Sequence, residues 1–129
     1  SKVENPQGFP DWFNMTVTQS GWSGSPTAVA RFRIDGRQCT LVFDINGTSN
    51  SVDSTMTLPV NAAHTSNINF GSPLERGVNN GTGLTAGPKS FINTASTPGT
   101  LNLYPDWNAS TWTASGNKTA RGTIIYEIA

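Results

Sequence analysis

The chain has 129 residues, of which 12% are charged, and its formal net charge at neutral pH is zero. This length fits one domain with a substantial hydrophobic core, and the absence of net charge argues against binding of nucleic acid or of an anionic membrane through bulk electrostatics. No apolar stretch is long enough for a membrane span, so membrane insertion is not expected. The abundance of Thr, Ser, Asn and Gly predicts a polar, uncharged surface.

The chain begins with a segment that does not read as part of a folded domain. Residues 1–12 contain two prolines and lack hydrophobic periodicity, so we expect a connector to an upstream segment. From residue 13, apolar and polar residues alternate, with Phe13, Met15 and Val17 on one side, as in a strand. The folded domain is therefore expected to span residues 13–129.

Residues 28–46 predict a β-hairpin whose register can be read from the sequence. Two-residue hairpin turns favour Asp and Gly, which tolerate positive φ, so Asp35-Gly36 is expected at the centre of the turn. Side chains alternate across a strand, so this register gives one polar face, with Val29 opposite Val42, and one apolar face. The apolar face consists of Ala28, Ala30, Phe32, Cys39, Leu41 and Phe43.

Cys39 is the only cysteine, so the chain has no intrachain disulfide. Its place on the apolar face of the hairpin predicts a small buried residue, since free cysteines are among the most buried residue types. A nucleophilic role is not expected.

The rest of the chain predicts further short strands. They are expected near residues 52–58, 68–70, 90–93 and 100–104. Residues 71–89 are expected to form a long loop, or a short strand between two loops. A long final strand over residues 119–128 would place one set of alternate residues inward, namely Ala120, Gly122, Ile124, Tyr126 and Ile128.

About eight short strands with frequent turn signals are typical of an all-β fold. No segment has apolar residues at helical spacing over the length of a helix. We therefore expect a knob-like antiparallel β-sandwich or jelly roll.

Two segments resemble a known family. The first, within residues 21–60, contains Gly21-Trp22, Ala30–Gly36, Phe43–Asn50 and Thr57-Leu58-Pro59; the second, within 101–129, contains Trp112–Gly116 and Gly122–Ile128. These patterns resemble the C-terminal tip or knob domains of bacteriophage fibres, tail needles and related appendages. The resemblance implies a β-sandwich or jelly-roll knob on the virion surface, usually trimeric, that contacts the host. The family has no fixed binding motif that maps onto this chain.

The clearest candidate for ligand binding is the aromatic segment Tyr104–Trp112. A Trp ring can stack on the apolar face of a sugar while neighbouring Asp and Asn side chains hold its hydroxyls. The alternative is that Trp107 covers the end of the core and that Trp112, like Trp22, is structural. The candidate ligand-binding residues are Tyr104, Asp106, Trp107, Asn108 and Trp112.

No catalytic residue, metal ligand or cofactor site is assigned from the sequence. His64 is the only histidine and lacks partners at zinc-ligand spacing. Asp44 and Asp53 flank a polar turn and leave Ca²⁺ as a minor alternative. No nucleophile elbow is present, and Glu75 and Asp106 are carboxylates in expected loops without a defined pairing.

Three functions compete, and they differ in the expected oligomeric state and in glycan binding. The leading hypothesis is a receptor-binding knob of a trimeric phage fibre or tail appendage that recognises a glycan on the host cell surface. The alternatives are a carbohydrate-binding module of a secreted enzyme and a purely structural trimerisation cap. Val29, Val42 and Ile125 on otherwise polar strand faces favour a homotrimer, because a partner subunit would cover them.

Overall fold

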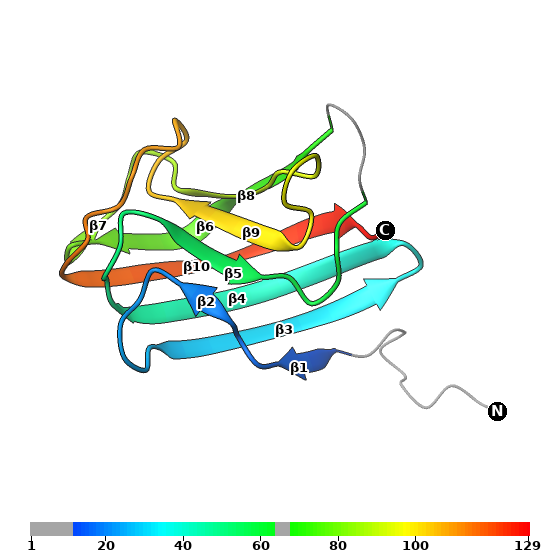
Figure 1. Ribbon diagram of the computed structural model, residues 1–129, viewed down its shortest axis with the longest axis horizontal. Helices are drawn as coiled ribbons and strands as arrows, with labels where there is room; N and C mark the ends of the chain where they lie inside the picture. The colour runs from blue at the N-terminus through cyan, green and yellow to red at the C-terminus, as the bar shows by residue number, and fades with distance from the viewer. Residues whose placement is uncertain (1–11, 64–67) are drawn as a thin grey trace.

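The computed structural model describes residues 12–63 and 68–129, so most of the expected connector and His64 lie outside the described residues. The regular structure of the described residues is antiparallel β-sheet, which confirms the predicted all-β class (Figure 1). No helix long and apolar enough to cross a membrane occurs in these residues. The strands are β1 (Phe13–Met15), β2 (Gln19–Ser20), β3 (Thr27–Asp35), β4 (Gln38–Thr48), β5 (Ser54–Thr57), β6 (Phe70–Asn79), β7 (Thr82–Gly83), β8 (Lys89–Ile92), β9 (Thr100–Tyr104) and β10 (Asn117–Glu127).

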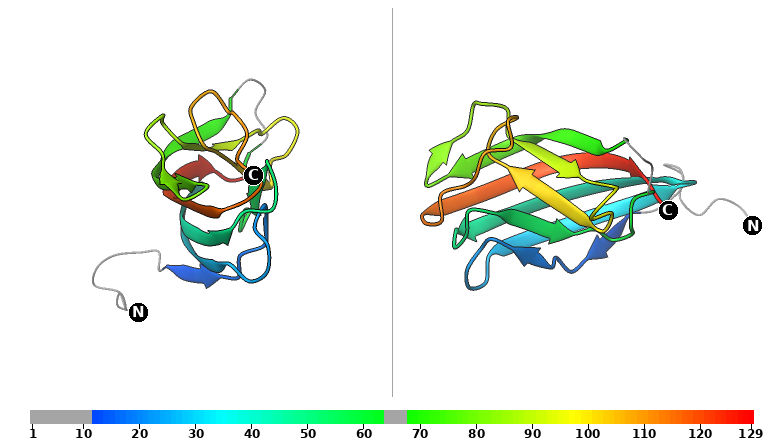
Figure 2. Two further views of the ribbon diagram at one scale, coloured as in Figure 1. Left: turned by 90° about the vertical axis from the view of Figure 1, so that its left-hand side faces the viewer. Right: turned by 45° about the horizontal axis from the view of Figure 1, so that its top comes forward.

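These strands form one continuous hydrogen-bonded sheet. Its order is β1-β3-β4-β10-β6-β8-β9-β5-β2, and β7 pairs with β6. Strand β6 joins the two halves, because residues 74–78 pair with β10 and residues 70–73 pair with β8. The sheet curls until the two halves face each other across one core (Figure 2). The finer expectation of a sandwich or jelly roll stays a prediction, since the described strands form one curled sheet.

A change of register in β6 accompanies the curl. Arg121 of β10 pairs with Arg76, but the next residue, Gly122, pairs with Leu74, so β6 has one extra residue at this point. Such a β-bulge bends a strand and increases its twist. The bulge lies at Glu75, within the part of β6 that pairs with β10 and close to the part that pairs with β8.

The β3–β4 hairpin confirms the predicted faces but corrects the predicted register. Ala30 lies opposite Phe43 and Phe32 lies opposite Leu41, a shift of two residues from the expected pairing. Because side chains alternate with a period of two, this shift leaves every side chain on its predicted face. The turn is centred on Gly36-Arg37, and only Gly36 has positive φ, at +65°. This is the pattern of a turn with Gly at its first central position, so Asp35 ends the strand.

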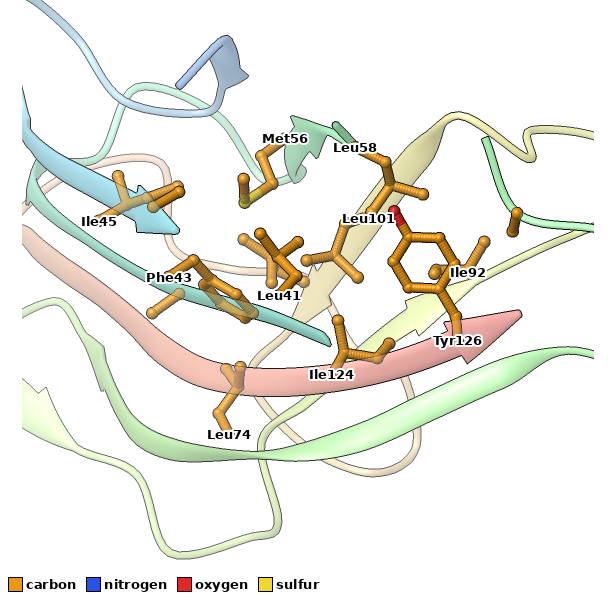
Figure 3. Packing of buried hydrophobic residues seen from close by; sticks show 14 of the residues in the cluster. Leu41, Phe43, Ile45, Met56, Leu58, Leu74, Ile92, Leu101, Ile124 and Tyr126 are labelled. Atoms are coloured by element: carbon orange, nitrogen blue, oxygen red, sulfur yellow. The ribbon is translucent and has the colours of Figure 1, made fainter. Parts of the chain in front are cut away.

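The core lies between the two halves of the sheet. Cys39 is fully buried, as predicted, and burial raises the pKa of its thiol. The inward residues of β10 are also confirmed, because Ala120, Ile124 and Tyr126 are buried. Figure 3 shows the side chains that meet at the centre of the core, among them Leu41, Phe43, Ile45, Met56, Leu58, Leu74, Ile92, Leu101, Ile124 and Tyr126.

The segment expected to be mainly loop is where the prediction was wrong. Residues 70–79 form the ten-residue strand β6, although this stretch contains Pro73 and two glycines. Pairing with both β8 and β10 supplies hydrogen bonds that local strand propensity does not reveal. Two residues expected to lie in strands, Val52 and Ile68, instead precede strands and are exposed.

Candidate functional site

Residues 105–116 connect β9 to β10 and contain most of the predicted ligand-binding residues. This connection lies at the end of the sheet away from the C-terminus and from the β3–β4 turn (Figure 1). It is anchored to the neighbouring connection after β7, because the backbone N–H of Trp107 donates to the Ala86 carbonyl at 3.3 Å. Gly87 also lies against the Trp107 side chain, and its φ of +73° is a conformation that favours glycine.

Asp106 organises the tip of this connection. Its Oδ1 accepts hydrogen bonds from the backbone N–H groups of Asn108, at 3.1 Å, and Ser110, at 3.0 Å. The hydrogen bond from Ser110 is the main reason that the pKa of this carboxyl lies below its usual value. Asp106 therefore holds the backbone, in addition to any contact with a ligand that the sequence suggested.

Ala109, on the same turn, has an unusual backbone conformation. Ala109 has a φ of +61°, in the left-handed region that residues other than Gly, Asn and Asp rarely occupy. Its N–H donates to the carbonyl of Asp106 at 3.2 Å, so the same turn holds it in place. The tip is a tight turn fixed by hydrogen bonds within residues 106–110.

Trp107 lies on this turn with its side chain in solvent. It is 67% exposed, more than any other large apolar side chain in the described residues. Tryptophan is highly buried on average in folded proteins. The alternative in which Trp107 covers the end of the core therefore does not fit its exposure, and the ring is available for contact with a ligand.

Trp112 belongs to the core, which corrects its placement among the ligand-binding residues. Its exposed fraction is 2%, and its Nε1–H donates to the carbonyl of Leu103 at 2.8 Å. Its backbone N–H donates to the carbonyl of Val52 at 2.9 Å. These bonds tie the end of the 105–116 connection to β9 and to the segment before β5, as in the structural alternative.

Lys118 is a buried residue that the sequence analysis missed. It is fully buried, and its Nζ donates to Ser54 Oγ at 2.6 Å. The ammonium also lies 4.7 Å from the ring centre of Trp22 and 5.5 Å from that of Trp112. Burial lowers the pKa of this amine to about 8, while the charge of Asp53 opposes the shift. Lys118 lies on the same inward face of β10 as Ala120 and Ile124, but the predicted strand began at residue 119, two residues after the start of β10.

Tyr104 lies apart from the tip, beside a hollow on the outer side of β5 and β9. This hollow has a volume of about 330 Å³ and is lined by Tyr104, Asn102, Asp53 and Thr55, among others. The Tyr104 ring is half-buried, with Lys89 Nζ at 5.7 Å from its centre. The predicted residues thus divide into Tyr104 at the hollow, Trp112 in the core, and Asp106, Trp107 and Asn108 at the tip.

Two of the carboxylates named from the sequence, Asp44 and Glu75, lie beside the same arginine. Oδ2 of Asp44 lies 3.5 Å from Nε of Arg121, and Glu75 lies 3.8 Å from the same nitrogen. Residues 12–63 and 68–129 contain no group of three or more His, Cys, Asp or Glu side chains that could hold a metal ion. The arrangement of Asp44 and Asp53 therefore gives no support to the Ca²⁺ alternative.

Comparisons with known proteins place no relative beside this chain. A scan against protein-family models found no match, and neither did searches among curated proteins and solved structures. Function is therefore inferred from the residues of the chain itself.

Proposed function

We propose that this chain is a non-enzymatic recognition domain at the tip of a trimeric phage fibre or tail appendage, and that it binds a glycan on the host cell surface. The resemblance of residues 21–60 and 101–129 to phage tip domains supports its place on the virion surface. The exposed Trp107 on its fixed turn supports the glycan as ligand.

Trp107 is the observation that carries this proposal. An exposed indole costs solvation free energy unless a ligand covers it, and its flat apolar face suits the C–H face of a pyranose ring. The turn fixed by Asp106 reduces the conformational entropy that binding would otherwise cost. A rigid aromatic side chain with polar neighbours is the usual composition of a small-molecule site.

The trimer is proposed from the outer face of β3, β4 and β10. Val29 and Ile125 on this face are each more than half exposed, and Val42 lies between their strands. Val29 pairs with Asp44 and Val42 with Arg31, so the two valines are diagonal neighbours and not the direct pair that the sequence predicted. A hollow of about 450 Å³ between Val29, Val42 and Arg121 gives this face relief that a second subunit could fill.

Binding to a glycan array tests the proposed function. The chain, W107A and W12A are compared on the same array and on host cells. Trp12 is the matched control, since it is also partly exposed but lies against Arg31 and Arg33, away from the 105–116 connection. We expect W107A to lose binding and W12A to retain it, with both melting temperatures near that of the parent chain. Absence of glycan binding by the parent chain, or full binding by W107A, would contradict the proposal.

Light scattering tests the trimer separately. We expect a mass three times the 13.7 kDa of the chain at tens of micromolar. V29D combined with V42D should yield monomers, because a buried charge without a partner is costly at an interface. A parent chain that is monomeric at this concentration would contradict the trimer and leave glycan binding to be judged by the array.

A further inference from the structure

We propose that the hollow between β5, β9 and residues 109–111 binds one neutral monosaccharide unit of the glycan. This inference rests on the proposed function and names the part of the ligand that gives it specificity. At about 330 Å³, the hollow is at the small end of the range of about 300–1,000 Å³ that ligand pockets occupy. That size favours a single sugar ring over a larger ligand.

The lining of the hollow combines one aromatic wall with several hydrogen-bonding groups. Thr55 and Asn102 lie opposite each other on β5 and β9, on the face directed away from the core. Tyr104 lies next on the same face of β9, and Asp53, Ser110 and Thr111 add further polar groups to the lining. Hydroxyl, amide and carboxylate groups around an aromatic ring are the combination that a polyhydroxylated ring requires.

These groups are held in place before a ligand arrives. Nδ2 of Asn102 donates to the carbonyl of Phe91 on β8 at 3.3 Å, which fixes the plane of the amide. Residues 109–111 are held at one end by the Asp106 turn and at the other by the hydrogen bond from the Trp112 N–H to Val52. Because its walls are two paired strands and an anchored segment, the hollow needs little ordering on binding.

The backbone of Ala109 gives a second, independent observation. Residues in sparsely populated backbone regions cluster at ligand-binding sites, because the surrounding structure must stabilise them. Ala109 lines the hollow and has a φ of +61°. This strained turn brings residues 109–111 over the outer face of β5 and β9, and thereby closes one side of the hollow.

Asp53 is the charged side chain among the residues that line the hollow. Its carboxylate lines the hollow and can accept hydrogen bonds from two hydroxyl groups. A uronic or sialic acid would place a second negative charge beside it. The hollow should therefore prefer a neutral hexose to an acidic sugar.

Filling the hollow is the sharpest test. T55Y places a ring into the hollow, and the matched control T57Y places the same ring two residues further along the same face of β5, outside the hollow. Tyr and Thr both have high strand propensity, so both variants should fold. The parent chain is titrated with methyl glucoside, methyl galactoside, methyl mannoside and methyl glucuronide while its backbone amide NMR signals are followed.

We expect one neutral glycoside to shift the amides of residues 53–55, 102–104 and 109–111, with a Kd on the order of 1 mM for a ligand of this size. T55Y should weaken this binding at least tenfold and T57Y less than twofold. D53N should narrow the preference for the neutral glycoside over the glucuronide at least threefold. If no glycoside shifts these amides, or T55Y binds as tightly as T57Y, the inference is wrong.

The same variants distinguish this inference from the proposed function. If W107A loses binding to the glycan array while T55Y retains it, Trp107 binds the glycan and the hollow does not. If T55Y loses binding while W107A retains it, the hollow binds the sugar and the role of Trp107 is wrong. Loss in both variants supports both assignments.

Discussion

Trp107 and Trp112 lie five residues apart in one connection and have opposite surroundings. Trp107 is 67% exposed, whereas Trp112 is 2% exposed. The indole N–H of Trp112 donates to the carbonyl of Leu103, and its ring lies beside the buried ammonium of Lys118. Trp107 is attached to the neighbouring connection through its backbone N–H.

The difference shows that one connection can be packed against the core at one end and expose its side chains to solvent at the other. Trp112 and its hydrogen bonds hold the end of the connection near β10 against the core. The Asp106 turn then holds the other end in a fixed conformation without burying its side chains. A rigid scaffold that positions an exposed loop is the general arrangement of recognition sites.

The largest expected effect comes from removing the anchor. W112A should lower the free energy of unfolding by about 3–5 kcal/mol, the usual cost of truncating a large core side chain. W112F keeps most of the ring but leaves the Leu103 carbonyl without its donor, so it should cost about 1–3 kcal/mol. Chemical denaturation measures both. A loss below about 1 kcal/mol for W112A would show that Trp112 is not part of the core.

The second prediction concerns Lys118, whose ammonium lies beside the Trp112 ring. The pKa of Lys118 falls from an ordinary 10.5 to about 8 in the folded chain. Between these values the unfolded chain binds a proton that the folded chain does not, so stability rises with pH. The stability gained from deprotonating Lys118 is fully present above pH 10.5 and is lost as the pH falls through about 8.

K118M measures this contribution, because methionine has a similar shape and does not titrate. The free energy of unfolding of the parent chain minus that of K118M should rise by up to about 3 kcal/mol between pH 7 and pH 10.5. The contacts with the Trp22 and Trp112 rings favour the charged amine, which makes this value an upper limit. A difference that is flat or falls over this range would contradict the account of Lys118.

A smaller effect on stability is expected at Ala109, the residue with positive φ in the turn formed by residues 106–110. A109G should increase the free energy of unfolding by about 0.5–1 kcal/mol, because glycine adopts positive φ without steric cost. A109V should decrease it by more than about 1 kcal/mol, since a β-branched residue is the least suited to this conformation. Equal stability of the two variants would mean that the backbone at residue 109 is not held at positive φ.

The smallest change in stability is expected at the exposed ring of Trp107. W107A should alter the free energy of unfolding by less than about 0.5 kcal/mol, as is usual for an exposed side chain. The same substitution made at Trp112 provides the direct comparison. A loss above about 2 kcal/mol for W107A would show that its ring is packed in solution.

The alternating strands were predictable because each of them buries one face. The inward residues of β4 and β10 follow directly from the period of two, and Cys39, Ile124 and Tyr126 are buried as predicted. The hairpin register was not fixed by the same signal, because Asp35-Gly36 and Gly36-Arg37 turns place the same side chains inward. The backbone at Asp35 separates the two registers, because the predicted turn needs positive φ at this residue and Asp35 does not have it.

The parts that escaped prediction depend on contacts distant in sequence. Strand β6 is stabilised by β8 and β10, and its Gly, Pro and polar residues give little local indication of a strand. The candidate site was predictable only as a rich aromatic segment. That signal included the exposed Trp107 but could not separate it from Trp112, whose partner Leu103 and neighbour Lys118 are brought together by the fold.

The most direct test of this account is ¹⁹F NMR of the chain labelled with 5-fluorotryptophan and titrated with a glycan that it binds on the array. The four tryptophan signals are assigned with single Trp→Phe variants. We expect the Trp107 signal to shift with ligand concentration while the Trp12 signal stays in place. A shift of the Trp12 signal without one at Trp107 would contradict the assignment of the tip as the recognition surface.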